Sequence, residues 1–342
     1  MTVGDLGEAA LIALIRSQVP SAPGWVTTGI GDDAAVVAPM RGTLDVITTD
    51  TQVEGVHFER ALLSPFDIGH RTLAVNLSDL AAMGATPRVA VLSLVLPPSL
   101  ATADLEAMIE GLLSLATAHD VALVGGNITR TSGPLVLGVT AIGAVRRRRI
   151  LTRDGGRPGD ELWVTGTLGS ASAGLTWLQQ QQAGHAPADQ EPRQGIQSYR
   201  RPTPRVRIGA LLGRNRVARA GIDLSDGLAD GLRQLGQASG LGALIHGSAV
   251  PMAPETVAWF AHRQQHPLEA AMTGGDDYEL LIAVPRSHRR RLAAIQRLSH
   301  GVPLTRIGEL TKTLDLVVRT ETGDLPVPAG YQHFQDTVSS PA

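Results

Sequence analysis

Apolar residues recur at helical spacing in some stretches of this chain and form short continuous runs in others, which predicts alternating helices and strands. In the first half, the pattern predicts helices at 65–83 and 104–119 and strands at 44–49, 89–96, 121–124 and 135–145. The strand at 44–49 is expected to end in an acidic turn, and the strand at 121–124 to end at Gly125, Gly126 and Asn127. A turn-rich segment at 155–160 then marks a domain boundary.

The second half continues the alternation. Strands are predicted at 161–165, 280–284, 305–307 and 314–318, with a further short strand ending at 222–223, and helices at 170–182, at 227–239 and from 201–204 onward. Residues 179–197 begin with four successive glutamines, and their polar part, 183–197, is predicted to be a loop. The whole pattern predicts a two-domain α+β fold, with an N-terminal α/β domain at 1–148 and a C-terminal α+β domain at 149–342.

Carboxylates recur at glycine-containing turns beside these apolar runs. The five motifs are Gly-Ile-Gly-Asp-Asp at 29–33, Thr-Thr-Asp-Thr at 48–51, Asn-Leu-Ser-Asp-Leu at 76–80, Asp-Leu-Ser-Asp-Gly at 223–227 and Gly-Gly-Asp-Asp-Tyr-Glu at 274–279. Each one alone has an ordinary explanation as a solvated turn, a side-chain turn or a helix cap. Five in one chain favour a site for hard cations such as Mg²⁺, which prefers carboxylates together with substrate phosphates.

The amino-acid composition limits the ways in which this chain could bind phosphate and the partners it could have. The only lysine, Lys312, is not in a P-loop sequence, so phosphates would have to be met by cations, arginine and backbone N–H groups. The chain has no cysteine, which excludes disulfides and thiolate chemistry. With a net charge of −2 and no apolar run of membrane-spanning length, we expect a cytoplasmic protein that binds neither nucleic acid nor membrane.

Single residues are weaker indicators. The run Arg146–Arg149 is more typical of a solvated edge than of a nucleic-acid site, whereas Arg153, beside a turn, is a candidate phosphate ligand. Asn76 and Asp79 are three residues apart and therefore share one helix face. Metalloprotease, α/β-hydrolase and Rossmann motifs are absent from the sequence.

The five motifs, in this order and at this spacing, resemble those of the thiamine-monophosphate kinase family. The resemblance covers residues 4–334 and includes Thr-Thr-Asp-Thr-x-Val-x-Gly-x-His-Phe at 48–58 and Gly-Tyr-Gln-His-Phe at 330–334. The wider superfamily, which includes aminoimidazole ribonucleotide synthetase, uses ATP with divalent cations and no P-loop. The resemblance implies an N-terminal domain that dimerises through its sheet, with ATP bound between the two domains.

The resemblance also implies roles for individual residues. It implies metal ligation by Asp33, Thr48, Thr49, Asp50, Asp79, Asp223 and Asp226. It implies ATP contacts by Gly126, Asn127, Arg153 and Ser225, and thiamine monophosphate contacts by His57, Asp276 and Tyr331. Asn127 is a departure, because the family usually has aspartate there, so a cation at this position would be held by one charge fewer.

The implied activity is direct in-line transfer of a phosphoryl group from ATP to thiamine monophosphate, with several Mg²⁺ ions, the last step in making thiamine diphosphate. The acceptor phosphate is already ionised, so no side chain is expected to act as acid or base. Two alternatives are another ATP-dependent enzyme of the superfamily with a different acceptor, and a nucleotide-binding regulator without turnover. Asn127 is the one feature that favours the regulator.

Overall fold

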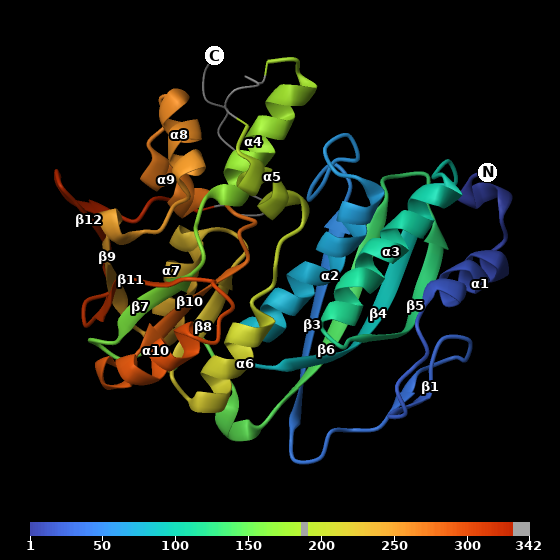
Figure 1. The fold of residues 1–342 in the computed structure, drawn as a ribbon, viewed down its shortest axis with the longest axis horizontal. Coiled ribbons are helices and arrows are strands. Elements are labelled where there is room, and N and C mark those ends of the chain that lie inside the picture. The colour runs from blue at the N-terminus through green and yellow to red at the C-terminus, as the bar shows by residue number, and fades with distance from the viewer. Residues whose placement is uncertain (186–190, 331–342) are drawn as a thin grey trace.

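The computed structural model describes residues 1–185 and 191–330 and has two domains, each built on its own sheet. Figure 1 shows them side by side, with α2 of the N-terminal domain facing the C-terminal domain. The helix also contacts α6 and β8 of that domain. The predicted α+β class is confirmed.

The N-terminal sheet has four strands in the order β3-β6-β4-β5. Only β4 and β5 run parallel to each other. The strands are β3 (Leu44–Val53), β4 (Thr86–Leu96), β5 (Ala122–Arg130) and β6 (Val136–Val145). In Figure 1, α2 (Pro65–Ala82) and α3 (Thr102–Ala118) cover one face of this sheet, and α1 (Glu8–Gln18) lies near β5. A short pair, β1 (Val26–Thr28) and β2 (Val36–Val37), and η1 (Val3–Asp5) precede the sheet.

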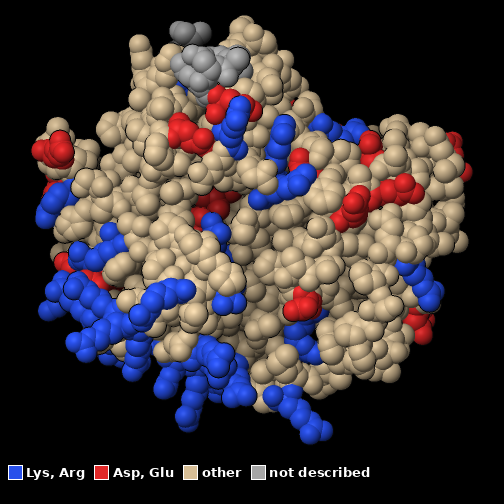
Figure 2. Space-filling model, in the orientation of Figure 1, with Lys and Arg blue, Asp and Glu red and all other residues tan. Residues whose placement is uncertain are grey.

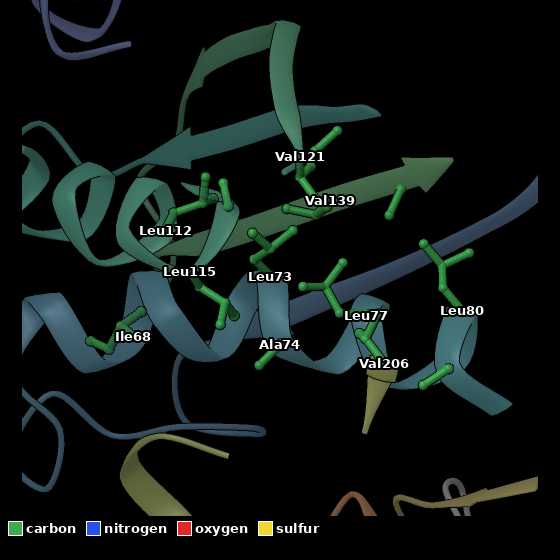
Figure 3. Close-up of a cluster of buried hydrophobic side chains, with 14 of the residues drawn as sticks. Ile68, Leu73, Ala74, Leu77, Leu80, Leu112, Leu115, Val121, Val139 and Val206 are labelled. Atoms are coloured by element: carbon green, nitrogen blue, oxygen red, sulfur yellow. The ribbon is translucent and has the colours of Figure 1, made fainter. Parts of the chain in front are cut away.

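The local sequence explains how α2 starts and packs. Ser64 caps the helix by accepting a hydrogen bond from the Asp67 N–H, and Pro65 occupies the first turn. Gly69 is required at the crossing with α3, because a Cβ there would lie 1.7 Å from the Met108 carbonyl oxygen. Leu73, Leu77 and other apolar side chains of α2 then pack under the sheet (Figure 3).

The C-terminal sheet has seven strands in the order β13-β12-β9-β11-β7-β10-β8. They are β7 (Glu161–Thr165), β8 (Ala220–Leu224), β9 (Gly242–His246), β10 (Glu279–Val284), β11 (Leu304–Thr311), β12 (Leu316–Thr320) and β13 (Gly323–Pro326). The helices are α4 (Ser170–Gln182), α5 (Arg193–Arg200), α6 (Val206–Asn215), α7 (Leu228–Ser239), α8 (Pro254–His262), α9 (Pro267–Thr273) and α10 (Arg289–Gln296). Short 3₁₀ turns are η2 (Arg147–Arg149), η4 (Gly247–Ala249) and η5 (Arg286–His288).

Three predictions of local structure were wrong. Strand β3 continues to Val53, so Thr48–Asp50 lie inside a strand and not in a turn, because β3 pairs with β6 along its whole length. Strand β5 likewise continues to Arg130, because pairing with β4 overrides the Gly125-Gly126 turn signal. The predicted loop at 183–197 contains the start of α5 at Arg193, and its residues 186–190 lie outside the described part of the chain.

Candidate functional site

A cavity of about 510 Å³ lies between the two domains. Its walls come from β3 and the following loop, from α2, from α4 and α5, and from the loops after β8 and before β10. Seven of the predicted site residues line this cavity: Asp50, His57, Asp79, Asp223, Ser225, Asp226 and Asp276. Motifs that are far apart in the sequence therefore meet at one place.

Alternation along β3 decides which of its residues face α2. Thr48, Asp50 and Gln52 point toward the helix: Thr48 Oγ1 donates a hydrogen bond to Asp79, and Gln52 accepts one from Arg71. Thr49 points to the other face, where its hydroxyl donates to the Val139 carbonyl oxygen at 3.2 Å. In this arrangement, Thr48 and Asp50 are close to Asp79, and Thr49 is not.

Three carboxylates from separate elements interact in this cavity. Burial and the neighbouring Asp79 carboxylate raise the pKa of Asp50 to about 6. Burial and Asp79 likewise raise the pKa of Asp223 to about 7, against a hydrogen bond of 2.7 Å donated by Ser78. Repulsion between carboxylates is relieved when a cation lies among them, and oxygen ligands of this kind suit Mg²⁺.

The carboxylates are near each other without forming a closed metal-binding cluster. Within residues 1–185 and 191–330, no group of three His, Cys, Asp or Glu side chains is arranged to hold a metal ion. The donor set of Thr48, Asp50, Asp79, Asp223 and Asp226 nevertheless fits a hard cation, because it offers oxygen atoms alone. Water and substrate phosphates would have to complete the coordination, as is usual for Mg²⁺.

Two loops of the C-terminal domain are joined at the cavity. The Asp276 N–H donates to the Ser225 carbonyl oxygen at 2.7 Å, and the Tyr278 N–H donates to the Leu224 carbonyl oxygen at 3.0 Å. Gly275 is needed there, because a Cβ would lie 2.5 Å from the Ser225 carbonyl oxygen. The position of Asp276 is therefore fixed relative to Ser225.

His57 lies on the loop after β3. Its Nδ1 accepts a hydrogen bond from the Val53 N–H at 3.2 Å, and its neighbour Phe58 is buried. The ring lines the same cavity as Asp50 and Asp276. This location is compatible with a binding role for His57.

A second cavity, of about 550 Å³, lies at the β5 edge of the N-terminal sheet beside α1. It contains Asp33, Gly126 and Asn127, which are all exposed. The Asn127 Nδ2 donates to Thr129 Oγ1 at 3.1 Å. The structure therefore brings these three residues together, but not with the carboxylates between the domains.

Arg153 and Tyr331 are the remaining predicted residues. Arg153 lies outside the cavity lining and donates to Gln234 Oε1 at 2.5 Å, although its charge still acts to lower the pKa of Asp223. Tyr331 lies outside the described residues.

Figure 2 shows Lys and Arg gathered on the side where α6 and α10 lie in Figure 1. Arg147 and Arg148, in the arginine run, are exposed, as predicted for a solvated edge.

Sequence analysis missed Arg71 and Tyr199, which also line the cavity between the domains. A signal for Arg71 exists in the sequence: Arg71, Val75 and Asp79 are spaced four residues apart on the predicted helix. Such spacing places all three on one face, and all three line the cavity. Tyr199 carried no comparable signal, because it lies in a helix that the sequence did not predict.

The fold and the site define a two-domain protein of the AIR synthase-related class. The family model described as "AIR synthase related protein, N-terminal domain" matches residues 31–145, and the model for the C-terminal domain of the same class matches residues 157–321. The chain belongs to the thiamine-monophosphate kinase family within this class, since it is 40% identical over 333 residues to the thiamine-monophosphate kinase of Salmonella typhimurium. That match covers 96% of this chain and 98% of the relative.

Solved structures agree with this assignment. The crystal structure of thiamine-monophosphate kinase from Stenotrophomonas maltophilia is 36% identical, with a TM-score of 0.78 over 93% of this chain and 97% of that chain. AaThiL, solved in complex with AMPPCP and TMP, is 31% identical, with a TM-score of 0.73 over 93% of this chain and 95% of that chain. None of the helices among the described residues is long and apolar enough to cross a membrane.

Proposed function

We propose that this protein transfers the γ-phosphoryl group of ATP to the phosphate of thiamine monophosphate, which gives thiamine diphosphate. The observation that carries the proposal is the cavity between the domains, where Asp50, Asp79 and Asp223 converge in a chain of this kinase family. A relative with an ATP analogue and TMP bound supports this substrate pair. These matches favour the kinase over a superfamily enzyme with another acceptor and over a regulator without turnover.

The residues of the cavity suit phosphoryl transfer between two anions. We propose that Thr48, Asp50, Asp79, Asp223 and Asp226 hold several Mg²⁺ ions, and that Asp33, Thr49 and Asn127, which do not line this cavity, supply further ligands. Bound Mg²⁺ supplies positive charge that neutralises the two phosphates and stabilises the transition state. No side chain is needed as acid or base, because the acceptor oxygen is already ionised.

Other residues of the two domains would bind and position ATP and thiamine monophosphate. We propose that Ser225 and Arg153 contact ATP, with Gly126 and Asn127 as further ATP contacts. His57, Asp276 and Tyr331 would bind thiamine monophosphate. The Ser225 and Asp276 backbones are hydrogen-bonded at 2.7 Å, and this link supports a fixed spacing between the two substrates, on which in-line transfer depends.

We also propose a homodimer formed through the N-terminal sheet, in a cytoplasmic protein with domains at 1–148 and 149–342. In Figure 1, α2 and α3 cover one face of the sheet. On the other face, Ile47 is 67% exposed and Thr49 is exposed as well. Light scattering would test the dimer, and Ile47→Glu is expected to shift it toward monomer, because it would bury a charge in the interface.

The activity is tested by following thiamine diphosphate formation from ATP, Mg²⁺ and thiamine monophosphate. Precursors of aminoimidazole ribonucleotide, supplied in parallel, test the alternative acceptor. Turnover with the precursors but not with thiamine monophosphate would refute the proposal. Direct transfer also requires both substrates to be bound together, so double-reciprocal plots should intersect.

His57 provides a further test of direct transfer. If it only orients thiamine monophosphate, His57→Asn should raise KM for this substrate more than it lowers kcat. Parallel double-reciprocal lines, or a phosphohistidine trapped from ATP alone, would instead make His57 a covalent carrier.

A further inference from the structure

Arg71 is a buried cation in the wall of the cavity between the domains. It comes from α2, and its side chain is 2% exposed. Its Nη1 donates to the Tyr199 carbonyl oxygen at 2.8 Å and its Nε to Gln52 Oε1 at 3.3 Å, while its Nη2 forms an ion pair with Asp276. One guanidinium therefore joins β3, α5 and the loop before β10.

Two aromatic rings complete the surroundings of Arg71. The guanidinium carbon lies 4.9 Å from the ring centre of Tyr199 and 5.8 Å from that of Tyr278. Burial acts to lower the pKa of Arg71, but the Asp276 carboxylate and the two tyrosines raise it above its ordinary value, so the side chain stays charged. Burying a charge is costly unless it is paired and hydrogen-bonded, and these contacts meet that requirement.

The two carboxylate oxygens of Asp276 differ in their contacts with the part of the chain that the structure describes. Its Oδ1 accepts from Arg71 and, at 3.1 Å, from the Tyr278 hydroxyl. Its Oδ2 accepts no hydrogen bond from the described residues, and its side chain is 29% exposed in the cavity wall. Asp276 and Tyr278 also have left-handed backbones, with φ of 70° and 49°. Such strain in residues other than glycine is found where surrounding contacts hold a functional geometry.

We propose that Arg71 is a positioning residue for the acceptor substrate: it holds Asp276 by Oδ1, so that Oδ2 is left to bind the thiamine part of thiamine monophosphate. This inference rests on the proposed function. The thiamine part carries an amino group on its pyrimidine ring and a cationic thiazolium ring, and both are complementary to a carboxylate oxygen. In this proposal Asp276 binds thiamine monophosphate and not ATP, so Arg71 should affect the two substrates unequally.

The test compares Arg71→Met and Arg71→Lys with the wild type in steady-state assays and in calorimetric titrations with thiamine monophosphate. We expect Arg71→Met to raise KM and Kd for thiamine monophosphate roughly ten- to a hundredfold, as for loss of a hydrogen bond to a charged group. KM for ATP should change by less than about twofold, because the hydrogen bonds and the ion pair of Arg71 involve Gln52, Tyr199 and Asp276 and none of the residues proposed to contact ATP. Arg71→Lys should restore only part of the affinity, because it keeps the charge but loses the planar fork.

A matched control is Arg88→Met. Arg88 is also buried and stacked on an aromatic ring, 4.5 Å from the ring centre of Trp25, but it does not line the cavity. Arg88→Met should leave both KM values unchanged even if it lowers the melting temperature. If Arg71→Met raised both KM values equally, or lowered stability alone, Arg71 would be a structural residue and the inference would be wrong.

Tyr278→Phe keeps the test decisive if Arg71→Met does not fold. This variant removes only the hydroxyl that donates to Asp276 Oδ1 and keeps the ring, so it should raise KM for thiamine monophosphate alone, by about tenfold, the lower end of the range for a hydrogen bond to a charged group. An unchanged KM would overturn the inference. Failure of the proposed function would look different, since the wild type itself would then neither bind nor phosphorylate thiamine monophosphate.

Discussion

The acidic motifs of this chain lie in two regions that differ in their exposure to water. Between the domains, Asp50 and Asp223 come from separate sheets, interact with Asp79, and have raised pKa values. At the β5 edge, Asp33 and Asn127 share a cavity of similar size but are exposed. Charges that are removed from water interact far more strongly than solvated ones. A carboxylate in the first region should therefore matter much more for catalysis than one in the second.

Asp50→Asn should produce the largest effect. We expect kcat to fall on the order of a hundredfold or more with the fold intact, because a charge that stabilises the transition state is lost. The measurement is the steady-state rate at saturating Mg²⁺. Asp45→Asn is the matched control, because Asp45 is an exposed aspartate of the same strand. Near-normal turnover of Asp50→Asn would remove Asp50 from the site.

The next largest effect is expected in the pH dependence of the free energy of unfolding, which should depend on the buried carboxylates between the domains and not on Asp33 at the β5 edge. Asp223 has a pKa of about 7 in the folded protein and an ordinary value of 3.8, so between these values the folded state binds more protons than the unfolded state. The free energy of unfolding, measured without Mg²⁺, should therefore fall as pH rises from 5 to 8, by on the order of 1 kcal/mol.

Two substitutions and the addition of Mg²⁺ test whether this pH dependence comes from Asp223. Asp223→Asn should reduce the fall in unfolding free energy between pH 5 and pH 8, because the amide does not titrate, while Asp50 and Asp277, whose pKa values are raised to about 6 and about 7, keep the rest of it. Asp33→Asn should leave the fall unchanged, since Asp33 is exposed at the other cavity. Mg²⁺ should stabilise the wild type more at pH 8, where Asp223 is ionised, than at pH 5, where it is protonated. A wild type that grows more stable toward pH 8 without Mg²⁺ would contradict the assignment.

Asp33→Asn should have a smaller effect on turnover than Asp50→Asn. An exposed charge contributes up to about 1 kcal/mol, so we expect the Mg²⁺ concentration for half-maximal rate to rise by no more than about fivefold. Titrations of rate against Mg²⁺ at fixed substrate would measure it. A loss of kcat as large as that of Asp50→Asn would mean that the two regions act as one site during turnover.

Much of the fold could be predicted because apolar spacing is a local signal. The helix at 65–83 and the strand at 161–165 are confirmed almost to the residue. Strands β3 and β5 were predicted too short, since partners distant in the sequence extend them through polar and glycine residues. Strand β9 and helices α8 to α10 were missed.

The site was predicted less completely than the fold. The motifs predicted Asp50, Asp79 and Asp223 as site residues, and these do meet at the cavity between the domains. The same motifs also predicted Thr49 and Asp33, whose side chains lie elsewhere. Motif spacing does not tell which face of a strand carries a residue until the strand is known to continue, as β3 does. Arg71 was missed because its importance depends on contacts with Tyr199 and Asp276, which are remote in sequence.

Asn127→Asp should have the smallest effect, and it tests the exposed region directly. The family usually has aspartate here, and replacing the amide with a carboxylate adds one negative charge to a cavity that already contains Asp33. We expect the Mg²⁺ concentration for half-maximal rate to fall about two- to threefold, as for one solvated charge. The carboxylate would also lose the hydrogen bond that Asn127 now donates to Thr129, so Asn127→Ala serves as the control for that loss. If Asn127→Asp left the requirement unchanged or raised it, Asn127 would not contact metal, and the exposed region would contribute to binding ATP without holding a cation.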